Sequence, residues 1–588
     1  MDLGGRNSAA ARNQASSGRA IGPPERLPAR AAEPRKSRRA QAELGGTLSQ
    51  LDATQLIIGD TPQYFFDDGL IEEVQHVTRR LHRPVGVDGS PFIQRDRPWE
   101  HVPYFSSVDW SLWRDPESQR LHCTYTDLNV DRERLARKGG AFIDWANGRL
   151  RVCYAYSDDG FEWVKPPLGL VHESGHDTNI ILGSEAYGSV WGLSVFDDPL
   201  EHDPSRRYKG FHVMVPPGYA VASDEPGAHV RVGYSPDGIR WTVGDDRPTV
   251  GRTGSRIGDS AQPAFDPGTG TYLLFTRHPW MSLAPRSRPL HATELGGHPT
   301  WDASAGAPNR RGRRRIYLSE SRDYLHWSEP RLILAPDPLL DNIDDSFYSM
   351  SAMWLGGQWI GFVQVFHMVE NTLDVQLVHS RDGRHWQRLF PGQAWLPLGP
   401  PGSWNQFYTS LPRFPDVDGP EWLVFHGGSK SHHDWWIHGQ EEGLDAPEAW
   451  DMNLVGFGLG LAKLRKFGFV SLDADRMREG MILTQPWVAP GQRLVINAAC
   501  GPEGYIKVEA LDVHDRVLAG CSRDDCDVFT GDAIAHTVTW RGDPRLPVDI
   551  PSLGGEVYTH RLPHRRLRFI LRDAQLYSFR IETSASTA

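Results

Sequence analysis

Three aspartates stand at the start of short apolar segments that lie far apart in the sequence. They are Asp109, Asp259 and Asp345. If a fold brings them together, one protonated carboxyl group and one ionised carboxylate could act on opposite sides of a single bond as acid and base, or as acid and nucleophile. Asp259 follows Gly258 and precedes a run of small residues, so turn chemistry explains it least well. We therefore predict these three residues as catalytic candidates.

Other polar and aromatic side chains are candidates for binding a substrate. Asp68, Glu100 and Asp344 lie near predicted strand ends, where a turn cap or a solvated carboxylate is the competing interpretation. The remaining candidates are Arg277, His367, Trp404, His426, His433 and Trp435.

Three of these residues belong to a Gly-rich segment, residues 425–436, that also holds a Lys and an Asp. Aromatic faces beside polar donors suit a sugar subsite. A His-rich metal site is the alternative, but the spacing matches no standard ligand set. We therefore predict no metal ligands and no cofactor. A structural Ca²⁺ ion is not indicated by the sequence, although it is compatible with it.

We expect β-strands to position the candidate acids, because a seven-residue strand-and-turn motif recurs along the chain. The motif has Ser at its first position, Asp at its third and Trp at its seventh. Its four copies are residues 157–163, 235–241, 321–327 and 380–386. Each follows a short apolar run, so it predicts a strand that enters an Asp turn and a Trp that opens the next strand. The aspartates of these turns, Asp159, Asp237, Asp323 and Asp382, are predicted to be structural.

Turns that recur with several short strands between them predict a radial all-β array. A degenerate fifth copy at residues 464–470 completes five predicted blades. From residue 486 the segments alternate without the Trp turn, which favours an antiparallel β-sandwich. We therefore predict a disordered tail over residues 1–48, a five-bladed β-propeller over 49–485 and a C-terminal β-sandwich over 486–588.

Composition limits the classes of partner and the cellular location that we expect. A formal charge of −11 over 588 residues argues against nucleic acid as a partner. The five cysteines are an odd number without metal-like spacing. No apolar run reaches the length of a membrane span, and no secretory segment is recognisable, so we expect no membrane contact and a cytoplasmic location. The protein would be secreted if translation starts elsewhere.

The repeated Trp turns, the segments 66–72 and 258–260 and the closing segment 567–579 resemble a bacterial group similar to glycoside hydrolase families 32, 43 and 68. The resemblance implies a five-bladed propeller, often followed by a β-sandwich, and a carbohydrate substrate. The characteristic family 32 motifs do not stand in their expected places. Arg114, Asp115 and Pro116 lie in a predicted outer turn.

These observations predict a glycosidase that cleaves a terminal or small glycan unit. Its active site would be a channel mouth bounded by Asp109, Asp259 and Asp345, with residues 426–436 as one wall. A phosphorylase or transglycosylase on the same scaffold and a non-catalytic carbohydrate-binding propeller are the alternatives. The separation of the two carboxyl groups would distinguish retention, at about 5 Å, from inversion, at roughly 6.5 to 9.5 Å.

Overall fold

The computed structural model describes residues 56–107, 109–130, 150–184, 187–215, 229–243, 248–250, 260–277, 314–342, 344–415, 419–433, 435, 447–489, 491–547 and 564–583. The predicted disordered tail, residues 1–48, lies outside them. The described residues are nearly all strand, with short 3₁₀ turns such as η1 (Pro204–Arg206) and η4 (Pro447–Ala449). The all-β prediction is confirmed.

Within the described residues, most strands between residues 103 and 465 fall into five antiparallel groups of four principal strands each, which we call blades. A parallel bridge between Leu373 and Tyr408 joins the fourth and fifth groups into one sheet. Blade one contains β6 (Trp110–Arg114), β7 (Leu121–Asp127), β8 (Arg151–Ser157) and β11 (Ile180–Leu182), with β5 (Pro103–Tyr104) beside β7. Blade two contains β12 (Ser189–Asp197), β13 (Tyr208–Val215), β14 (His229–Ser235) and β15 (Thr242–Val243). Blade three contains β17 (Ser260–Asp266), β18 (Thr271–Arg277), β19 (Ile316–Ser321) and β21 (Arg331–Leu334).

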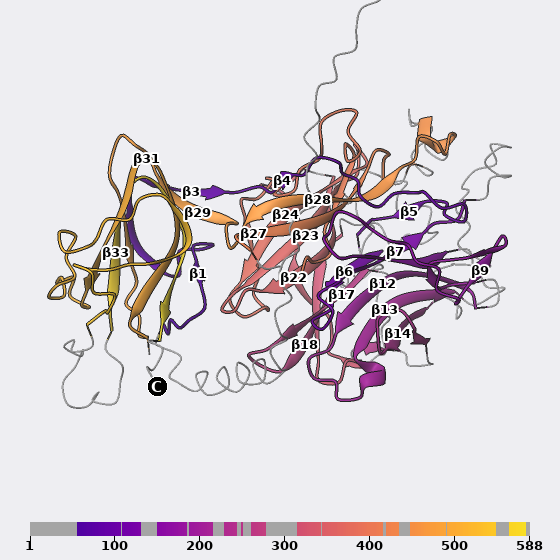
Figure 1. Cartoon of the computed structure of the whole chain (residues 1–588), viewed down its shortest axis with the longest axis horizontal. Coiled ribbons are helices and arrows are strands. Elements are labelled where there is room, and N and C mark those ends of the chain that lie inside the picture. Colours follow the sequence, from indigo (N-terminus) through magenta and orange to yellow (C-terminus); the bar gives the residue numbers. More distant parts are fainter. Residues whose placement is uncertain are drawn as a thin grey trace, which may run out of the picture.

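Blade four contains β22 (Asp345–Trp354), β23 (Trp359–His367), β24 (Thr372–Ser380) and β25 (Gln387–Leu389). Blade five contains β26 (Tyr408–Ser410), β27 (Glu421–Ser429), β28 (Phe457–Arg465) and, as its outermost strand, β4 (Val85–Gly86). The last blade is therefore completed by a strand from near the beginning of the chain (Figure 1).

The four Trp turns have the same hydrogen bonds. In the first, Ser157 Oγ accepts from the Gly160 amide at 2.8 Å, and Asp159 Oδ1 accepts from the Phe161 amide at 2.8 Å. The indole of Trp163 donates to the Gly160 carbonyl at 3.1 Å. The equivalent bonds form in the other three copies. The turn aspartates therefore have the structural role that was predicted.

The Trp of a turn seals its blade against the preceding one. Trp386 of blade four lies 5.5 Å from Phe275 of blade three, and Trp327 of blade three lies 5.9 Å from Phe211 of blade two, measured between ring centroids. Trp163 of blade one lies 6.0 Å from Phe425 of blade five. Blade one is therefore packed against blade five. Trp327 and Trp386 are buried, whereas Trp163 and Trp241 are half-buried.

The innermost strands of neighbouring blades are joined by side-chain hydrogen bonds. These bonds run from Ser111 to the Leu193 carbonyl, from Ser194 to the Ala261 carbonyl, from Ser351 to the Leu411 carbonyl and from the Trp110 indole to Ser410. Side chains of these strands, including Val195 and Gln262, leave a central cavity of only about 20 Å³, which holds about one water. A cavity of this size is too small for a sugar ring.

The C-terminal unit is an eight-stranded antiparallel sheet that curls around its own apolar core (Figure 1). Its long strands are β31 (Arg493–Leu511) and β33 (Arg566–Glu582), whose pairing register shifts twice and bends the sheet. The other strands are β1 (Gln63–Tyr64), β2 (Ile71–Gln75), β3 (Val77–Leu81), β29 (Val470–Ala474), β30 (Gly480–Thr484) and β32 (Asp532–Thr537).

The strands of this sheet do not all follow residue 486, where the sequence predicts the domain boundary. Both β29 and β30 pair with β33, and β2 and β3 join their outer edges, so the unit takes strands from before and after the propeller. The predicted fifth Trp-like turn is instead the link between β28 and β29. Short alternating strands have the same pattern in either sheet, which is why the sequence pattern does not locate this boundary.

All five cysteines are unpaired. No helix among the residues that the structure describes has the length and apolar character required to cross a membrane.

Candidate active site at the channel mouth

The innermost strands all begin at one end of the propeller, which we call the channel mouth. The antiparallel registers place Asp345 opposite His367 and Ser260 opposite Arg277 at this end. The Trp turns lie at the other end. Asp259 directly precedes β17, but it lies outside the described residues, as do Asp434 and Trp436.

Asp109 is held at the mouth by the turn that precedes β6. Its amide donates to the Ser106 carbonyl at 2.8 Å, and its carbonyl accepts from the Thr126 amide at 2.8 Å. Ser107 has a φ of 46°, a left-handed conformation that a non-glycine residue adopts at a cost. The Ser107 amide donates to the phenol oxygen of Tyr408 at 2.8 Å, and Ser106 contacts the same oxygen at 2.6 Å. Blade five thereby fixes the half-buried Asp109 of blade one.

Asp345, which is buried, and His367 and Asp374, which are half-buried, form a row of alternating charges in blade four. Nδ1 of His367 lies 2.6 Å from Oδ1 of Asp345, and Nε2 lies 3.2 Å from Oδ2 of Asp374. Burial alone lowers the pKa of His367, but the two carboxylates outweigh it and raise that pKa to about 10. Burial alone raises the pKa of Asp345, but the hydrogen bond from His367 and the Asn342 amide hold it below its ordinary value. His367 is therefore an imidazolium, and Asp345 is ionised at neutral pH.

Arg277 lies at the mouth beside an aromatic residue of blade four. Its guanidinium carbon is 3.9 Å from the centre of the Tyr348 ring, and that of Arg314 is 4.4 Å from the same centre. The Tyr348 ring also meets the His433 ring edge to face at 4.8 Å. A guanidinium group over an aromatic face is a favourable arrangement.

His433 and Trp435 lie in the apolar layer beneath the mouth. The His433 ring is buried, and its Nδ1 lies 3.2 Å from the phenol oxygen of Tyr104. Trp435 is 0% exposed and packs on Phe457. These two residues of the predicted wall therefore support the mouth from below. In the structure as it stands, their side chains are covered.

Trp404 and His426 lie together in blade five. Their rings stack at 5.3 Å, and Trp404 covers the flat surface left by Gly428 and Gly460. Burial lowers the pKa of His426 to about 4, so the ring is neutral at pH 7. This pair fills a gap between strands.

The weaker carboxylate candidates have partners of their own. Glu100 is 1% exposed and accepts hydrogen bonds from Lys165 Nζ at 2.8 Å and from the Tyr125 phenol at 2.7 Å. Asp68 is exposed and pairs with Arg79 beside the C-terminal sheet. Asp344 is half-buried near the mouth and accepts from the Val369 amide at 2.9 Å. The structure therefore does not bring Glu100 and Asp68 to the residues around Asp345.

Several residues at the mouth were not among the predicted ones. Tyr408, Tyr348, Arg314 and Asp374 belong to it because they begin or closely flank strands whose ends meet there. In the sequence, these residues are marked only by their position next to predicted strand ends. Many other residues share that position, so it does not single them out.

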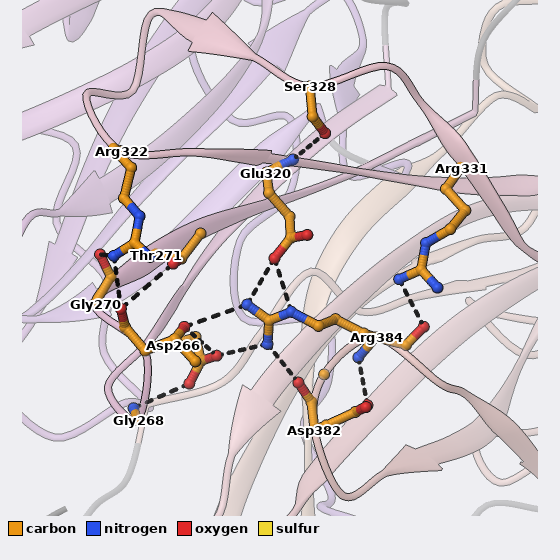
Figure 2. Close-up of polar contacts among 12 residues, drawn as sticks. Asp266, Gly268, Gly270, Thr271, Glu320, Arg322, Ser328, Arg331, Asp382 and Arg384 are labelled. Carbon is orange, nitrogen blue, oxygen red and sulfur yellow. Dashed lines mark hydrogen bonds and ion pairs between the residues drawn. The ribbon is translucent and has the colours of Figure 1, made fainter. Parts of the chain in front are cut away.

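A cavity of about 640 Å³ lies at the opposite end, between the turns of blades three and four, whose polar contacts are drawn in Figure 2. Arg384 dominates it and donates to Asp266 Oδ2 at 2.7 Å and to Glu320 Oε1 at 2.7 Å. Arg322 donates to the Thr269 carbonyl at 2.7 Å. These charged groups pair with one another and join two blades, so we assign them a structural role.

Among the described residues, no group of three or more His, Cys, Asp or Glu side chains has an arrangement suited to a metal ion.

The comparisons with known proteins do not assign the chain to a family. No protein-family model matches the chain, and no curated protein matches it. The similar solved structures include a family 43 arabinoxylan arabinofuranohydrolase from Bacillus subtilis in complex with cellotetraose, at 10% identity, covering 86% of this chain and 99% of that one, with a TM-score of 0.34.

A family 117 glycoside hydrolase from Zobellia galactanivorans is 13% identical, with 66% and 90% of the two chains covered and a TM-score of 0.33. An N-acetylgalactosamine deacetylase from F. plautii, in complex with blood group B trisaccharide, is 15% identical, with 66% and 95% covered and a TM-score of 0.39. At TM-scores below 0.5, these similarities establish neither a family nor an activity for this chain. Likeness at this level does not extend to a substrate or to a pair of catalytic residues.

Proposed function

We propose that the protein is a glycoside hydrolase that cleaves a terminal or small glycan unit at the channel mouth. One observation carries the proposal: Asp109 and Asp345 stand at the starts of the innermost strands of blades one and four, at the same end of the propeller.

The surroundings of the two carboxyl groups suggest their roles. Asp345 is held ionised by His367, so it is the candidate base or nucleophile. Asp109 is more exposed and is the candidate acid, which would protonate the departing oxygen. His367 contacts a carboxylate through each nitrogen, so we assign it a positioning role.

The test begins with hydrolysis of a panel of glycosides and short oligosaccharides by the full chain. Once a cleaved substrate is found, Asp109→Asn and Asp345→Asn should each lower kcat by about 10²-fold or more. The matched control is Asp197→Asn, because Asp197 ends an innermost strand at the far end and pairs with Arg207 at 3.3 Å. Its kcat should equal that of the wild type. Full activity in both Asp109→Asn and Asp345→Asn would show that the assignment is wrong.

The same panel separates the alternatives. Turnover that requires phosphate and yields a sugar phosphate would establish a phosphorylase. Binding without any cleavage would establish a carbohydrate-binding propeller. The anomer released first, observed by NMR, reports whether Asp345 acts as nucleophile, with retention, or as base, with inversion.

A further inference from the structure

Arg565 and Trp487 lie directly opposite each other in the C-terminal unit. The Trp487 amide donates to the Arg565 carbonyl at 2.9 Å, and the Arg565 amide donates to the Trp487 carbonyl at 2.8 Å. Opposite residues of an antiparallel pair project to the same face, with their Cβ atoms about 4.5 to 5.5 Å apart. The two side chains therefore start side by side. Both are buried, since Arg565 is 2% exposed and Trp487 is 0% exposed.

Each of these side chains has a buried N–H group without an acceptor. Nε of Arg565 and Nε1 of Trp487 have no hydrogen-bond partner among the residues that the structure describes. A second nitrogen of the same guanidinium, Nη1, donates to the Gly491 carbonyl at 3.4 Å. A buried donor that lacks an acceptor is unfavourable, and more so when it is charged. The pair therefore presents two adjacent donors to one small region of the core.

The charge of Arg565 is also uncompensated by the described part of the chain. Arginine stays protonated in folded proteins. The titratable group that interacts with Arg565 there is the thiol of Cys521, which is 3% exposed. Burial raises the pKa of Cys521 to about 11, so this thiol is uncharged at neutral pH. Buried charges in proteins are normally paired, so a guanidinium in this position favours the binding of an anion.

The surroundings define the kind of anion. An indole N–H and a guanidinium N–H are donors only, so the occupant must be an acceptor. Trp487 and Cys521 belong to the apolar core of the C-terminal unit. Entry into such surroundings requires loss of the hydration shell, which costs least for a small, singly charged and weakly hydrated ion. A halide meets these requirements better than sulfate or phosphate does.

We propose that Arg565 and Trp487 bind a chloride ion in the core of the C-terminal unit. The ion would connect segments from distant parts of the chain. Trp487 follows β30, Arg565 directly precedes β33, and the carbonyl of the neighbouring Val488 accepts from the Ile58 amide at 2.9 Å. Chloride should therefore stabilise the folded chain. The site lies outside the propeller, so the inference is independent of the proposed function.

Thermal unfolding of the full chain tests the proposal, with sodium gluconate replaced stepwise by sodium chloride at constant ionic strength. Chloride at about 0.2 M should raise the melting temperature by about 2 °C or more, and the rise should saturate. Arg565→Met and Trp487→Phe should each remove most of this rise. Without chloride, Arg565→Met should be at least as stable as the wild type, because the uncompensated charge is gone.

Arg388→Met is the matched control. The Arg388 side chain is only 11% exposed, but its Nη1 pairs with Oδ2 of Asp341 at 2.6 Å. This variant should be less stable than the wild type in both salts, because it leaves a buried carboxylate without its cation. It should nevertheless keep the full rise with chloride. The comparison therefore separates binding at Arg565 from a general effect of chloride on the protein surface.

Crystals soaked in sodium bromide locate the ion directly. Anomalous density should appear within hydrogen-bond range of both Arg565 Nε and Trp487 Nε1. If Arg565→Met does not fold, this position and the response of Trp487→Phe decide the question. The proposal is overturned if chloride has no effect, if the wild type and the two site variants respond equally, or if no anomalous density lies at the pair. Bromide density without a chloride effect in solution would be an adventitious ion only, and it would also overturn the proposal.

Discussion

Nδ1 of His367 lies 2.6 Å from Oδ1 of Asp345, and this contact sets the charge of the carboxylate at the start of β22. The second carboxylate, Asp374, keeps His367 protonated from the other side. The site that we propose therefore depends on a residue that does not itself reach the substrate.

Replacing His367 by Asn should raise the pKa of Asp345, because the main influence that lowers it is removed. The acidic limb of the kcat/KM profile should therefore move to higher pH. His379→Asn is the control, since His379 is also buried in blade four but has Asp67 as its nearby acid. A lower melting temperature with an unshifted acidic limb would mean that His367 is merely structural.

Loss of the same ion pair should lower the free energy of unfolding at alkaline pH. The pKa of His367 is about 10 in the folded chain and 6.5 as the ordinary value, so its contribution is complete below pH 6.5 and is lost as the pH rises through 10. Urea midpoints should fall for the wild type between pH 7 and 10. The fall should be smaller in His367→Asn, and equal falls in the two proteins would contradict the assignment.

Three other histidines should make the free energy of unfolding fall at acidic pH. Burial lowers the pKa of His122, His212 and His426 to about 4, below the ordinary 6.5. The folded chain binds fewer protons at these sites than the unfolded chain, so stability is lost as the pH falls from 6.5 towards 4. The loss should be on the order of 2 kcal/mol for each histidine, and His212→Gln should reduce it. A pH-independent urea midpoint over this interval would show that these rings are accessible to protons.

The Trp turns should govern stability without governing turnover. Trp386 is 8% exposed and contacts Phe275 of the preceding blade, so Trp386→Ala should cost about 3 to 5 kcal/mol of unfolding free energy. Trp163→Ala should cost less, because Trp163 is only half-buried. Activity per folded molecule should be unchanged in both. A loss of kcat without a loss of stability would contradict the structural role.

Arg384 offers a similar test at the far end of the propeller (Figure 2). Its removal leaves the buried Asp266 without its cation, so Arg384→Ala should destabilise the chain by about 2 to 4 kcal/mol. Asp266→Asn should recover part of that stability in the double variant, since the uncompensated charge is then removed. If the double variant is no more stable than Arg384→Ala, the unpaired charge of Asp266 is not the cause of the destabilisation.

The parts of the fold that were predictable from sequence are those built from local contacts. Each Trp turn closes its hydrogen bonds within seven residues, as between Ser157, Asp159 and Trp163, and its pattern is therefore visible in the sequence. The blade count followed from these turns, although the strand that completes blade five is β4 and not the predicted turn at residues 464–470.

Contacts between distant segments were not predictable in the same way. Val470 pairs with Leu81 across most of the chain, and nothing in either strand specifies that partner. Asp345 was predicted because it begins an apolar strand. Its dependence on His367 and Asp374 was not, because the three residues come from three different strands. The binding roles predicted for Glu100 and Trp404 stay predictions. Residue type did not indicate the contact of Glu100 with Lys165 or that of Trp404 with the glycines of blade five.

The most direct test of the active-site assignment is a crystal structure of the Asp109→Asn variant with an uncleaved substrate identified by the hydrolysis panel. The account predicts that the scissile oxygen lies at the channel mouth, within hydrogen-bond reach of residue 109, with Asp345 on the opposite side of the bond. Density for the glycan in the cavity around Arg384, or anywhere other than the mouth, would contradict it.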